Sequence, residues 1–304
     1  MEIEEIGEAE LERLVDVRNA VWPDDPSSTA QYVDWRRQAE DMIWVIARSG
    51  GVDVGMGEGI HGWHSPDGVG RLGAYVLTEA RGEGVGSALL GRVGDWLRSR
   101  GCSEATAELA EDDEASFEWA VRRGFVEVGR NPILALDLAT AELPELPPPP
   151  GVEIVAWSER PELARGLYEV YLEAAPDVPG EEEVATPSFD DWLANDMQGV
   201  SDKPEATFVA LVDGEVVGYG KLAIPPEGDV AWHDLIGVRR AWRGRGIAGG
   251  LKREQIRWAK SHGYRSLKTS NEERNEPVRR LNLRHGYRQE PGFVTVRGPL
   301  ERTG

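Results

Sequence analysis

The sequence is poor in the residues that would place it outside the cell or in a membrane. Cys102 is the single cysteine among 304 residues, so no disulfide can form within the chain, and a reducing compartment is expected. The best apolar run, TFVALV at 207–212, is far shorter than the roughly 18 residues of a membrane span. The first residues, MEIEE, are acidic where a secretion signal needs cations. We therefore expect a soluble, cytoplasmic protein with no membrane partner.

Basic residues are also scarce. The chain has 34 Lys and Arg against 54 Asp and Glu, which gives a formal net charge of −20. Binding along a nucleic acid needs a cationic face, so this balance argues against a nucleic-acid partner. Hydrophobic residues make up 40% of the chain, with 11 tryptophans, as expected of a globular protein and not of a disordered acidic chain. At roughly 100 to 200 residues per domain, the length suggests two domains.

Two motifs recur at one offset. RGEGVG at 81–86 returns as RGRGIA at 243–248, and RRGF at 122–125 returns as RHGY at 284–287, both 162 positions later (243 − 81 and 284 − 122). A shared offset indicates a tandem duplication. Between the copies lies a proline-rich segment, and proline lacks the amide donor that helices and central strands use. The boundaries predicted from this pattern are domains at 1–143 and 151–304, with a linker at 144–150.

Each glycine motif lies between a strand-like and a helix-like run. Apolar and β-branched residues at 72–77 and 230–238 predict strands before the motifs. Apolar residues at helical spacing predict helices after them, ending near Gly101 and Gly263. A short strand, a second helix and a last strand follow in each half, the last one around 293–296 in the second half. This order indicates an α+β domain that occurs twice.

The glycine turn is suited to an anion. A strand that enters a helix through such a turn leaves backbone amides unpaired at the positive end of the helix dipole. Phosphate fits there, glycine allows close approach of the backbone, and Arg243 and Arg245 can add charge-assisted contacts. A tight turn without a ligand is the alternative. GxGxxG is met at 244–249, but the first-half copy breaks this dinucleotide pattern and no acid follows about 20 residues later.

These residues resemble the GCN5-related N-acetyltransferase (GNAT) superfamily, whose acetyl-CoA motif Q/R-x-x-G-x-G/A lies at a strand-to-helix junction. Both 81–86 and 243–248 fit that motif. The later family signature N-x-x-A-x-x-x-Y-x-x-x-G-F maps onto Asn275, Val278, Asn282, Gly286 and Tyr287, and in the first half onto Asp113, Ser116, Ala120, Gly124 and Phe125. The arrangement is similar to that of tandem members, of which mycothiol synthase is one example.

The resemblance implies two tandem domains of mixed α+β class. Each would hold a mostly antiparallel central sheet whose fourth and fifth strands splay apart, flanked by helices. The implied activity is direct transfer, in a ternary complex, of an acetyl group from acetyl-CoA to a primary amine of a small molecule. A non-catalytic CoA-binding or interaction module is the alternative, and a longer acyl donor stays open. No metal is implied, and a monomer is slightly preferred because the tandem would form a pseudo-dimer.

The resemblance also implies which residues contact the donor. In the second half these are Ile236, Gly237, Val238, Arg243, Gly244, Arg245, Gly246, Ile247, Ala248, Asn271 and Asn275. A weaker second site in the first half would comprise Tyr75, Val76, Arg81, Gly82, Gly84, Val85 and Gly86. A bulge in the fourth strand would turn a backbone amide, that of Val238, toward the thioester carbonyl.

Charge distinguishes the two halves. Residues 239–288 hold 15 Lys and Arg and 4 Asp and Glu, a net of +11, whereas the shifted window 77–126 holds 6 and 10, a net of −4. Glu83 stands at the position of Arg245. Because free CoA carries roughly four negative charges, we predict that the second half binds acetyl-CoA and does the chemistry, while the first is degenerate. A solvated basic helix face is the alternative for the second half.

The catalytic candidates are His233, Asp234 and Asn282. An amine with a pKa near about 10 is mostly protonated at pH 7, so a base assists transfer. His233 and Asp234 lie on the predicted fourth strand, where alternation lets only one face the cleft, and a structural role is the alternative for each. The family's usual acid toward the leaving thiolate is a tyrosine, but position 282 is asparagine, which donates a hydrogen bond without releasing a proton. A thiolate with a pKa near about 8.5 can leave without a dedicated donor.

Overall fold

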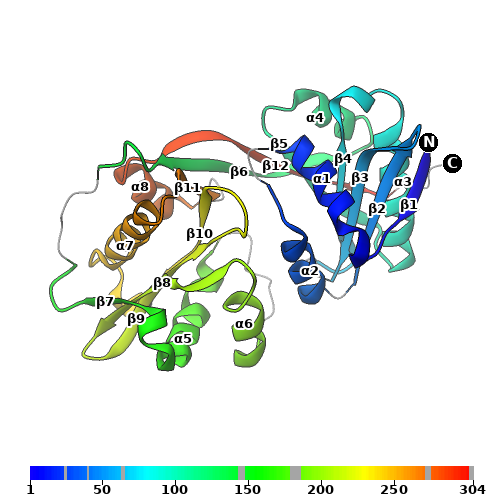
Figure 1. Ribbon diagram of the computed structural model, residues 1–304. Helices are drawn as coiled ribbons and strands as arrows, with labels where there is room; N and C mark the ends of the chain where they lie inside the picture. The colour runs from blue at the N-terminus through cyan, green and yellow to red at the C-terminus, as the bar shows by residue number, and fades with distance from the viewer. Residues whose placement is uncertain are drawn as a thin grey trace. The chain divides into compact units, whose positions relative to one another are not determined.

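The computed structural model describes the chain except for residues 24–25, 40, 63–65, 143–147, 179–185, 271–274 and 301–304. It forms two compact units (Figure 1). The first unit comprises Met1–Arg130 with Gly292–Gly304, and the second unit comprises Asn131–Pro291. Among the described residues, no helix combines the length and the apolar character that crossing a membrane requires.

The first unit is built on a sheet of strand order β1-β2-β3-β4-β5-β12. Its strands are β1 (Glu2–Glu5), β2 (Asp41–Ser49), β3 (Val52–His61), β4 (Val69–Val76), β5 (Glu104–Ala110) and β12 (Arg288–Pro299), the last entering this unit at Gly292. Its helices are α1 (Leu11–Val21), α2 (Thr29–Gln38), α3 (Val85–Ser99) and α4 (Glu114–Val121). Neighbouring strands are antiparallel except β4 and β5, which are parallel.

The second unit repeats this plan with the order β6-β11-β10-β9-β8-β7. Its strands are β6 (Val126–Asp137), which enters the unit at Asn131, β7 (Glu153–Ala156), β8 (Asp202–Val212), β9 (Glu215–Ala223), β10 (Val230–Val238) and β11 (Ser266–Ser270). Its helices are α5 (Ala164–Ala174), α6 (Phe189–Asp196), α7 (Ile247–Ser261) and α8 (Glu276–Arg284). Here β10 and β11 are the parallel pair. The predicted fold class, a mostly antiparallel mixed sheet flanked by helices in each half, is confirmed.

Alternation along β8 shows how one strand serves two helical layers. Val209 and Leu211 belong to a core cluster with residues of α5 and α6, including Trp192. Phe208 and Ala210, which point the other way, belong to a cluster with residues of α7. Because successive side chains of a strand alternate between faces, an uninterrupted apolar run such as TFVALV indicates a strand that is covered on both sides.

The last strands of the two repeats are exchanged between the units. In the first unit, Phe293–Pro299 of β12 pair antiparallel with Ala110–Glu104 of β5. In the second unit, Ile133–Asp137 of β6 pair antiparallel with Ser270–Ser266 of β11. The predicted strand at 293–296 is therefore present, but it completes the sheet of the first unit and not that of its own half. The predicted boundaries describe the repeat, and residues 144–147 of the expected linker at 144–150 lie outside the described residues.

Side-chain packing accompanies this exchange. Val294 and Val296 of β12 lie in a buried cluster with Ala120 and Phe125 of the first unit. Leu134 and Leu136 of β6 lie in a buried cluster with Tyr287 and other residues of the second unit. Each unit therefore buries apolar side chains contributed by the other half of the sequence, and we expect the strands to stabilise the units into which they insert.

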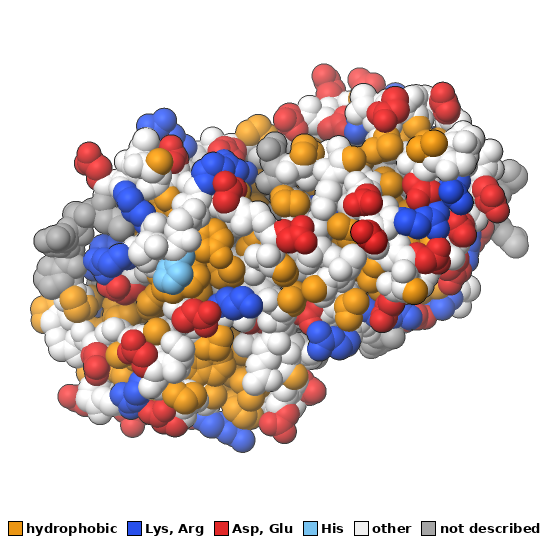
Figure 2. All heavy atoms as spheres, viewed as in Figure 1, with side chains coloured by type: hydrophobic (Ala, Val, Ile, Leu, Met, Phe, Trp, Pro, Cys, Tyr) orange, Lys and Arg blue, Asp and Glu red, His pale blue; other side chains and the backbone are white. Residues whose placement is uncertain are grey.

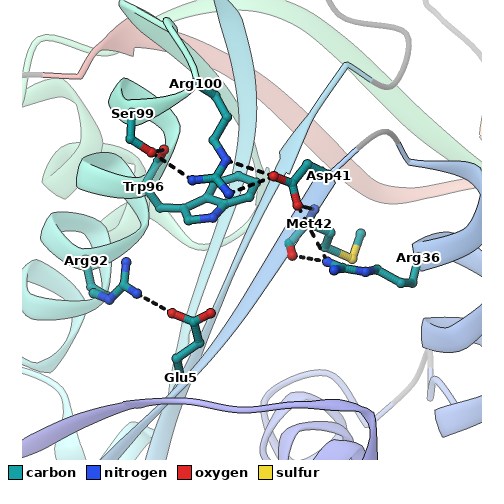
Figure 3. Close-up of polar contacts among 8 residues, drawn as sticks. All are labelled: Glu5, Arg36, Asp41, Met42, Arg92, Trp96, Ser99 and Arg100. Atoms are coloured by element: carbon teal, nitrogen blue, oxygen red, sulfur yellow. Dashed lines mark hydrogen bonds and ion pairs between the residues drawn. The ribbon is translucent and has the colours of Figure 1, made fainter.

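In the first unit, ion pairs connect the body of α3 to the sheet (Figure 3). The Arg100 guanidinium donates to Asp41 Oδ2 at 2.9 Å and 2.7 Å, and its centre lies 4.1 Å from the centroid of the Trp96 ring. Arg92 pairs with Glu5 of β1. These groups are partly exposed, so the pairs orient the helix more than they stabilise it. The opposite end of α3 meets the glycine turn.

Acidic and basic side chains are interspersed over the face drawn in Figure 2. Exposed charges separated by more than about 10 Å interact only weakly at physiological salt, because dissolved ions screen their fields. The difference in charge between the two halves therefore matters most at the few residues that border each glycine turn.

Candidate active site

In both units the parallel strands part after three paired residues. The pairing of β10 with β11 ends at Trp232 and Lys268, and that of β4 with β5 ends at Arg71 and Thr106. Beyond these points β10 continues to Val238 and β4 to Val76. The predicted splay of the fourth and fifth strands is confirmed in each unit, beside the strand end that precedes the glycine turn.

The two fourth strands differ in regularity. His233 of β10 pairs with Leu222 of β9, but Ile236 pairs with Gly220, so the register shifts by one residue between them. The pairing of β4 with β3 shows no such shift. A bulge re-aims the residues that follow it. The second unit thus has an irregularity immediately before Ile236–Val238, where the sequence predicted one, and its action on a thioester stays a prediction.

Gly237 is explained by a helix crossing. A Cβ at this position would lie 2.9 Å from Cβ of Ala174 and 3.2 Å from Cγ1 of Val170, both on α5. Glycine therefore allows α5 to approach β10 closely. Its neighbour Val238 is buried.

The turns that open α3 and α7 have the same backbone geometry. Gly244 and Gly246 have φ values of +75° and +83°, and Gly82 and Gly84 have values of +83° and +86°. Gly246 and Gly84 are the N-caps of their helices, and neither helix start has a side-chain cap. The amides at 247–249 and 85–87 precede the first helical hydrogen bonds, which reach back to the two N-cap carbonyls. Both turns therefore present amides to an anion.

The motif arginines bind the turns back to the strands. Arg243 Nε donates to the Val238 carbonyl at 3.0 Å, and Arg81 Nε donates to the Val76 carbonyl at 3.4 Å. Arg243 also pairs with Asp177 at 2.7 Å. The two contacts are equivalent under the repeat, so each arginine holds the strand end beside its turn. Contact with a cofactor is not required to explain either position.

The remaining second-unit residues that were predicted to contact acetyl-CoA differ in exposure and in their protein contacts. Arg245 is exposed, and its guanidinium lies 4.6 Å from the centroid of the Trp242 ring. Ile247 is buried beneath the turn, and Ala248 is half-buried. Asn275 is the N-cap of α8 but its side chain makes no cap hydrogen bond. Asn271 lies outside the described residues.

A cavity of about 530 Å³ opens in the first unit beside the splayed strands. All the residues predicted as the weaker second site line it: Tyr75, Val76, Arg81, Gly82, Gly84, Val85 and Gly86. Its remaining wall is largely apolar and includes Leu72, Leu90, Ala107, Leu109, Ala120, Phe125 and Val296. The structure thus brings the first-half residues together around a space that a ligand can enter.

One acid of the first unit was missed from the sequence. Glu58 on β3 accepts a hydrogen bond from the Tyr75 hydroxyl at 3.3 Å, and Tyr75 lines the cavity. Burial raises the pKa of Glu58, while the charges of Arg18 and Arg71 oppose the shift. Glu58 lies far from the glycine motif in sequence. The sequence feature that could have pointed to Glu58 is its place between two glycines in a strand with few other charged residues.

His233 faces the helix α7 side of the second unit. Its Nδ1 lies 3.1 Å from Gln255 Oε1, and its Nε2 is hydrogen-bonded to the Tyr287 hydroxyl. Burial, reinforced by the charge of Lys252, holds the pKa of His233 well below its usual value. Both ring nitrogens therefore have partners, and the ring is neutral at pH 7.

Asp234 is on the opposite face, as strand alternation predicts. Its carboxylate pairs with Lys221 Nζ at 2.7 Å and keeps 46% of its side chain exposed. Lys221 is buried and pairs with Asp202 at 2.8 Å. Nearby, burial raises the pKa of Asp196 to about 6, with Lys221 opposing the shift and the other two carboxylates adding to it. The acids of this face outnumber the one lysine among them.

Asn282 occupies the buried side of α8. Its side chain is fully buried, and among the residues that the structure describes neither Oδ1 nor Nδ2 has a hydrogen-bond partner. Buried amide groups nearly always have partners in folded proteins, so this position stands out from the rest of the site.

Comparison with known proteins supplies the family. The chain matches the Acetyltransferase (GNAT) family over residues 8–125 and 164–287. It is 30% identical over 121 residues to an aminoglycoside N(6')-acetyltransferase type 1 of Stenotrophomonas maltophilia, covering 38% of this chain and 78% of that protein. A protein of the same description from Klebsiella aerogenes is 38% identical over 58 residues, covering 19% and 38% of the two chains.

Solved structures share the fold from end to end. A GCN5-related N-acetyltransferase of Sphaerobacter thermophilus has a TM-score of 0.75 at 20% identity, covering 99% of this chain and 96% of its own. A tandem GNAT protein from the clavulanic acid biosynthesis pathway has a TM-score of 0.76 at 20% identity, covering 100% and 99%. With the family matched once in each half and the fold shared along the whole chain, this protein belongs to the GNAT family as a tandem acyltransferase.

Proposed function

We propose that the protein transfers an acetyl group from acetyl-CoA to a primary amine of a small molecule, directly within a ternary complex, and that the second unit does the chemistry. Family membership supports acetyl transfer to an amine. The observation that carries the assignment to the second unit is the bulge in β10, which lies where β10 and β11 part and which regular β4 does not share.

Acetyl-CoA fits the residues around the point where these strands part. The free amides of the Gly244–Ala248 turn would hold the phosphates, with Arg245 and Asn275 beside them. The strand end Ile236–Val238 would pair with the pantetheine. The cavity of the first unit, bordered by the equivalent turn and strand end, indicates the space that this arrangement provides. When bound, acetyl-CoA supplies the activated acyl group.

The acceptor amine would approach Asp234 from the α5 and α6 side. Three carboxylates, those of Asp196, Asp202 and Asp234, lie around the single ammonium group of Lys221. This surplus of negative charge favours the approach of a cationic amine. Asp234 is exposed enough to take a proton from the amine, directly or through water. His233, with both nitrogens bonded, would position β10 against α7. The similarity to aminoglycoside acetyltransferases supports a small-molecule acceptor with an amine.

Introducing an aspartate at equivalent positions of the two glycine turns tests whether the second unit does the chemistry. Ala248→Asp and Gly86→Asp each place a negative charge at the second residue of a helix, where it stabilises the helix itself. A Cβ at Gly86 has room, because its nearest neighbours are 3.7 Å away. At about 4 Å and an effective dielectric constant near 20, repulsion of a phosphate is about 4 kcal/mol, or roughly a thousandfold in affinity.

Calorimetric titration with acetyl-CoA and release of CoA with a panel of amines give the two readouts. We expect Ala248→Asp to lose turnover and Gly86→Asp to keep it. The reverse result would move the chemistry to the first unit. Tight acetyl-CoA binding with no CoA release for any amine would favour the non-catalytic module.

A further inference from the structure

Three apolar residues of the first cavity have polar residues at the equivalent positions of the second unit. Leu90, Ala120 and Phe125 all line the first cavity. The residues 162 positions later are Lys252, Asn282 and Tyr287. The same fold therefore needs no polar group at these positions, and their presence in the second unit calls for another reason.

Lys252 is a buried amine with no carboxylate partner among the described residues. Its side chain is 1% exposed on α7, and Nζ lies 5.0 Å from the centroid of the Tyr287 ring. Within the part of the chain that the structure describes, Nζ has no hydrogen bond and no carboxylate partner. The charged or titratable groups that face it are His233 and His285, whose pKa values its charge helps to lower, and the Tyr287 hydroxyl. Burial lowers the pKa of Lys252 to about 7.

Two buried amides of the same unit also lack partners among the described residues. Neither Oδ1 nor Nδ2 of Asn282 is bonded there, and Nε2 of Gln255, three residues after Lys252 on α7, is unpaired although both side chains are fully buried. Together with Lys252, these side chains offer three unused donor groups. Leaving such groups unpaired is costly, so their accumulation indicates a ligand atom that accepts hydrogen bonds.

The position along the cleft suggests which atom this is. Lys252 follows Ile247 by five residues, about 7.5 Å along the helix from the turn that would hold the phosphates. His233, linked to Tyr287, lies just before the bulge and the strand end Ile236–Val238. A donor that reached from the turn to that strand end would pass these positions, since Leu90, Ala120 and Phe125 at the equivalent positions of the first unit line its cavity.

We propose that Lys252 protonates the departing CoA sulfur in the second unit, with Asn282 donating a hydrogen bond to the same sulfur. The proposal rests on the proposed function. The amine nitrogen bonds to the acyl carbon, the carbon–sulfur bond breaks, and its electron pair goes to sulfur, which takes a proton from Nζ. The proton lost by the amine leaves on the Asp234 side, and solvent reprotonates Lys252.

The direction of this transfer is favourable. A thiol has a pKa of about 8.5 and Lys252 one of about 7, so the equilibrium favours the thiol and the neutral amine roughly 30-fold. About half of the lysine is charged at pH 7 and can act. An ordinary exposed lysine would hold its proton too tightly to donate it to this thiolate.

Lys252→Met removes the proton while keeping an unbranched side chain of similar length, and Lys260→Met on the exposed side of α7 is the matched control. Two readouts are needed. The first is the ratio of affinities for CoA and desulfo-CoA, measured by calorimetry, which reports contact with sulfur whether or not turnover occurs. The second is kcat with acetyl-CoA and an amine. We expect the preference for CoA to fall to the part that the Asn282 hydrogen bond supplies, and kcat to fall about a hundredfold, in the range typical of a lost general acid.

Lys252→Arg separates charge from proton donation. Arginine keeps a cation beside the sulfur but does not release its proton, so this variant should retain the preference for CoA and lose turnover. If Lys252→Met does not fold, Lys252→Leu, which copies the first unit, gives the same comparison. Loss of only one readout in the Met or Leu variant overturns the proposal, and so does a fully active Arg variant.

Failure of this inference can be told from failure of the proposed function. If only the inference fails, the wild-type protein turns over, Ala248→Asp does not, and Lys252→Met equals wild type. If the proposed function fails, Ala248→Asp leaves acetyl-CoA binding and turnover unaltered.

Discussion

Lys221 offers the sharpest test of how the second unit balances buried charge. Its Nζ lies 2.8 Å from Asp202 and 2.7 Å from Asp234, and it also donates to the Asp196 carbonyl. The side chains of Lys221 and Asp202 are 5% and 10% exposed, whereas Asp234 is 46% exposed. Lys221→Met keeps most of the buried volume and removes the charge. Of the two carboxylates that lose their ion pair in this variant, Asp202 is the less exposed to solvent.

The magnitude follows from these distances. At 2.8 Å and an effective dielectric constant near 20, the attraction of one ion pair is about 6 kcal/mol. Desolvation offsets part of it, and breaking a buried pair by removing one partner typically costs about 3–5 kcal/mol. We expect Lys221→Met to destabilise the second unit by that amount at pH 7. Asp234 adds little because it can turn toward water.

The pH dependence has a definite sign. Burial raises the pKa of Asp202 even in the presence of Lys221, which opposes the shift, and removal of the lysine raises it further. Stability linked to a raised carboxyl pKa is present below the pKa of the unfolded chain and is lost as pH rises through the folded value. The destabilisation by Lys221→Met should therefore shrink as the pH falls below 7.

Hydrogen exchange of the β9 amides, which reports opening of the second unit, measures both effects. The double variant Lys221→Met/Asp202→Asn removes the stranded charge and should recover part of the lost free energy. A loss below about 1 kcal/mol for Lys221→Met, or a double variant no more stable than the single one, would refute this account.

Two further predictions concern the turns and the exchanged strands. Gly84→Ala and Gly246→Ala force a left-handed residue to carry a Cβ and should each lower stability by about 1–2 kcal/mol in thermal unfolding, whereas Gly86→Ala, which has no positive φ, should be neutral or slightly stabilising. Equal effects at all three positions would contradict the backbone argument. Truncation before Gly292 should strip exchange protection from the β5 amides and leave β11 protected, since β12 pairs with β5 and β6 pairs with β11. Loss at β11 in place of β5 would contradict the observed pairing.

The sequence predicted the local elements well because their signals are local. The strand expected at 230–238 is β10, and the helix expected after 247 is α7. Glycines expected to end helices, Gly101 and Gly263, have positive φ. Periodicity and the conformational freedom of glycine act within a few residues, so they survive without knowledge of the tertiary structure.

Local sequence signals did not predict which unit the last strand of each repeat joins. β6 spans Val126–Asp137 and β12 spans Arg288–Pro299, positions that correspond under the 162-residue offset. Equivalent strands with similar patterns can complete either sheet, so the sequence indicates that two strands exist without indicating which unit each one joins. Only their partners, β5 for β12 and β11 for β6, decide it.

The site divides in the same way. By itself the sequence determined the duplication and the two glycine turns, because these depend on residue type and spacing along the chain. The splay of the strands beside the turns was implied by the family resemblance that those motifs carry. Tertiary structure alone decided that Lys252 is buried with no carboxylate partner among the described residues, that Asp234 is held by Lys221, and that the first unit encloses a cavity. Burial and pairing depend on residues distant in the sequence, and a side chain acquires its chemistry from those neighbours.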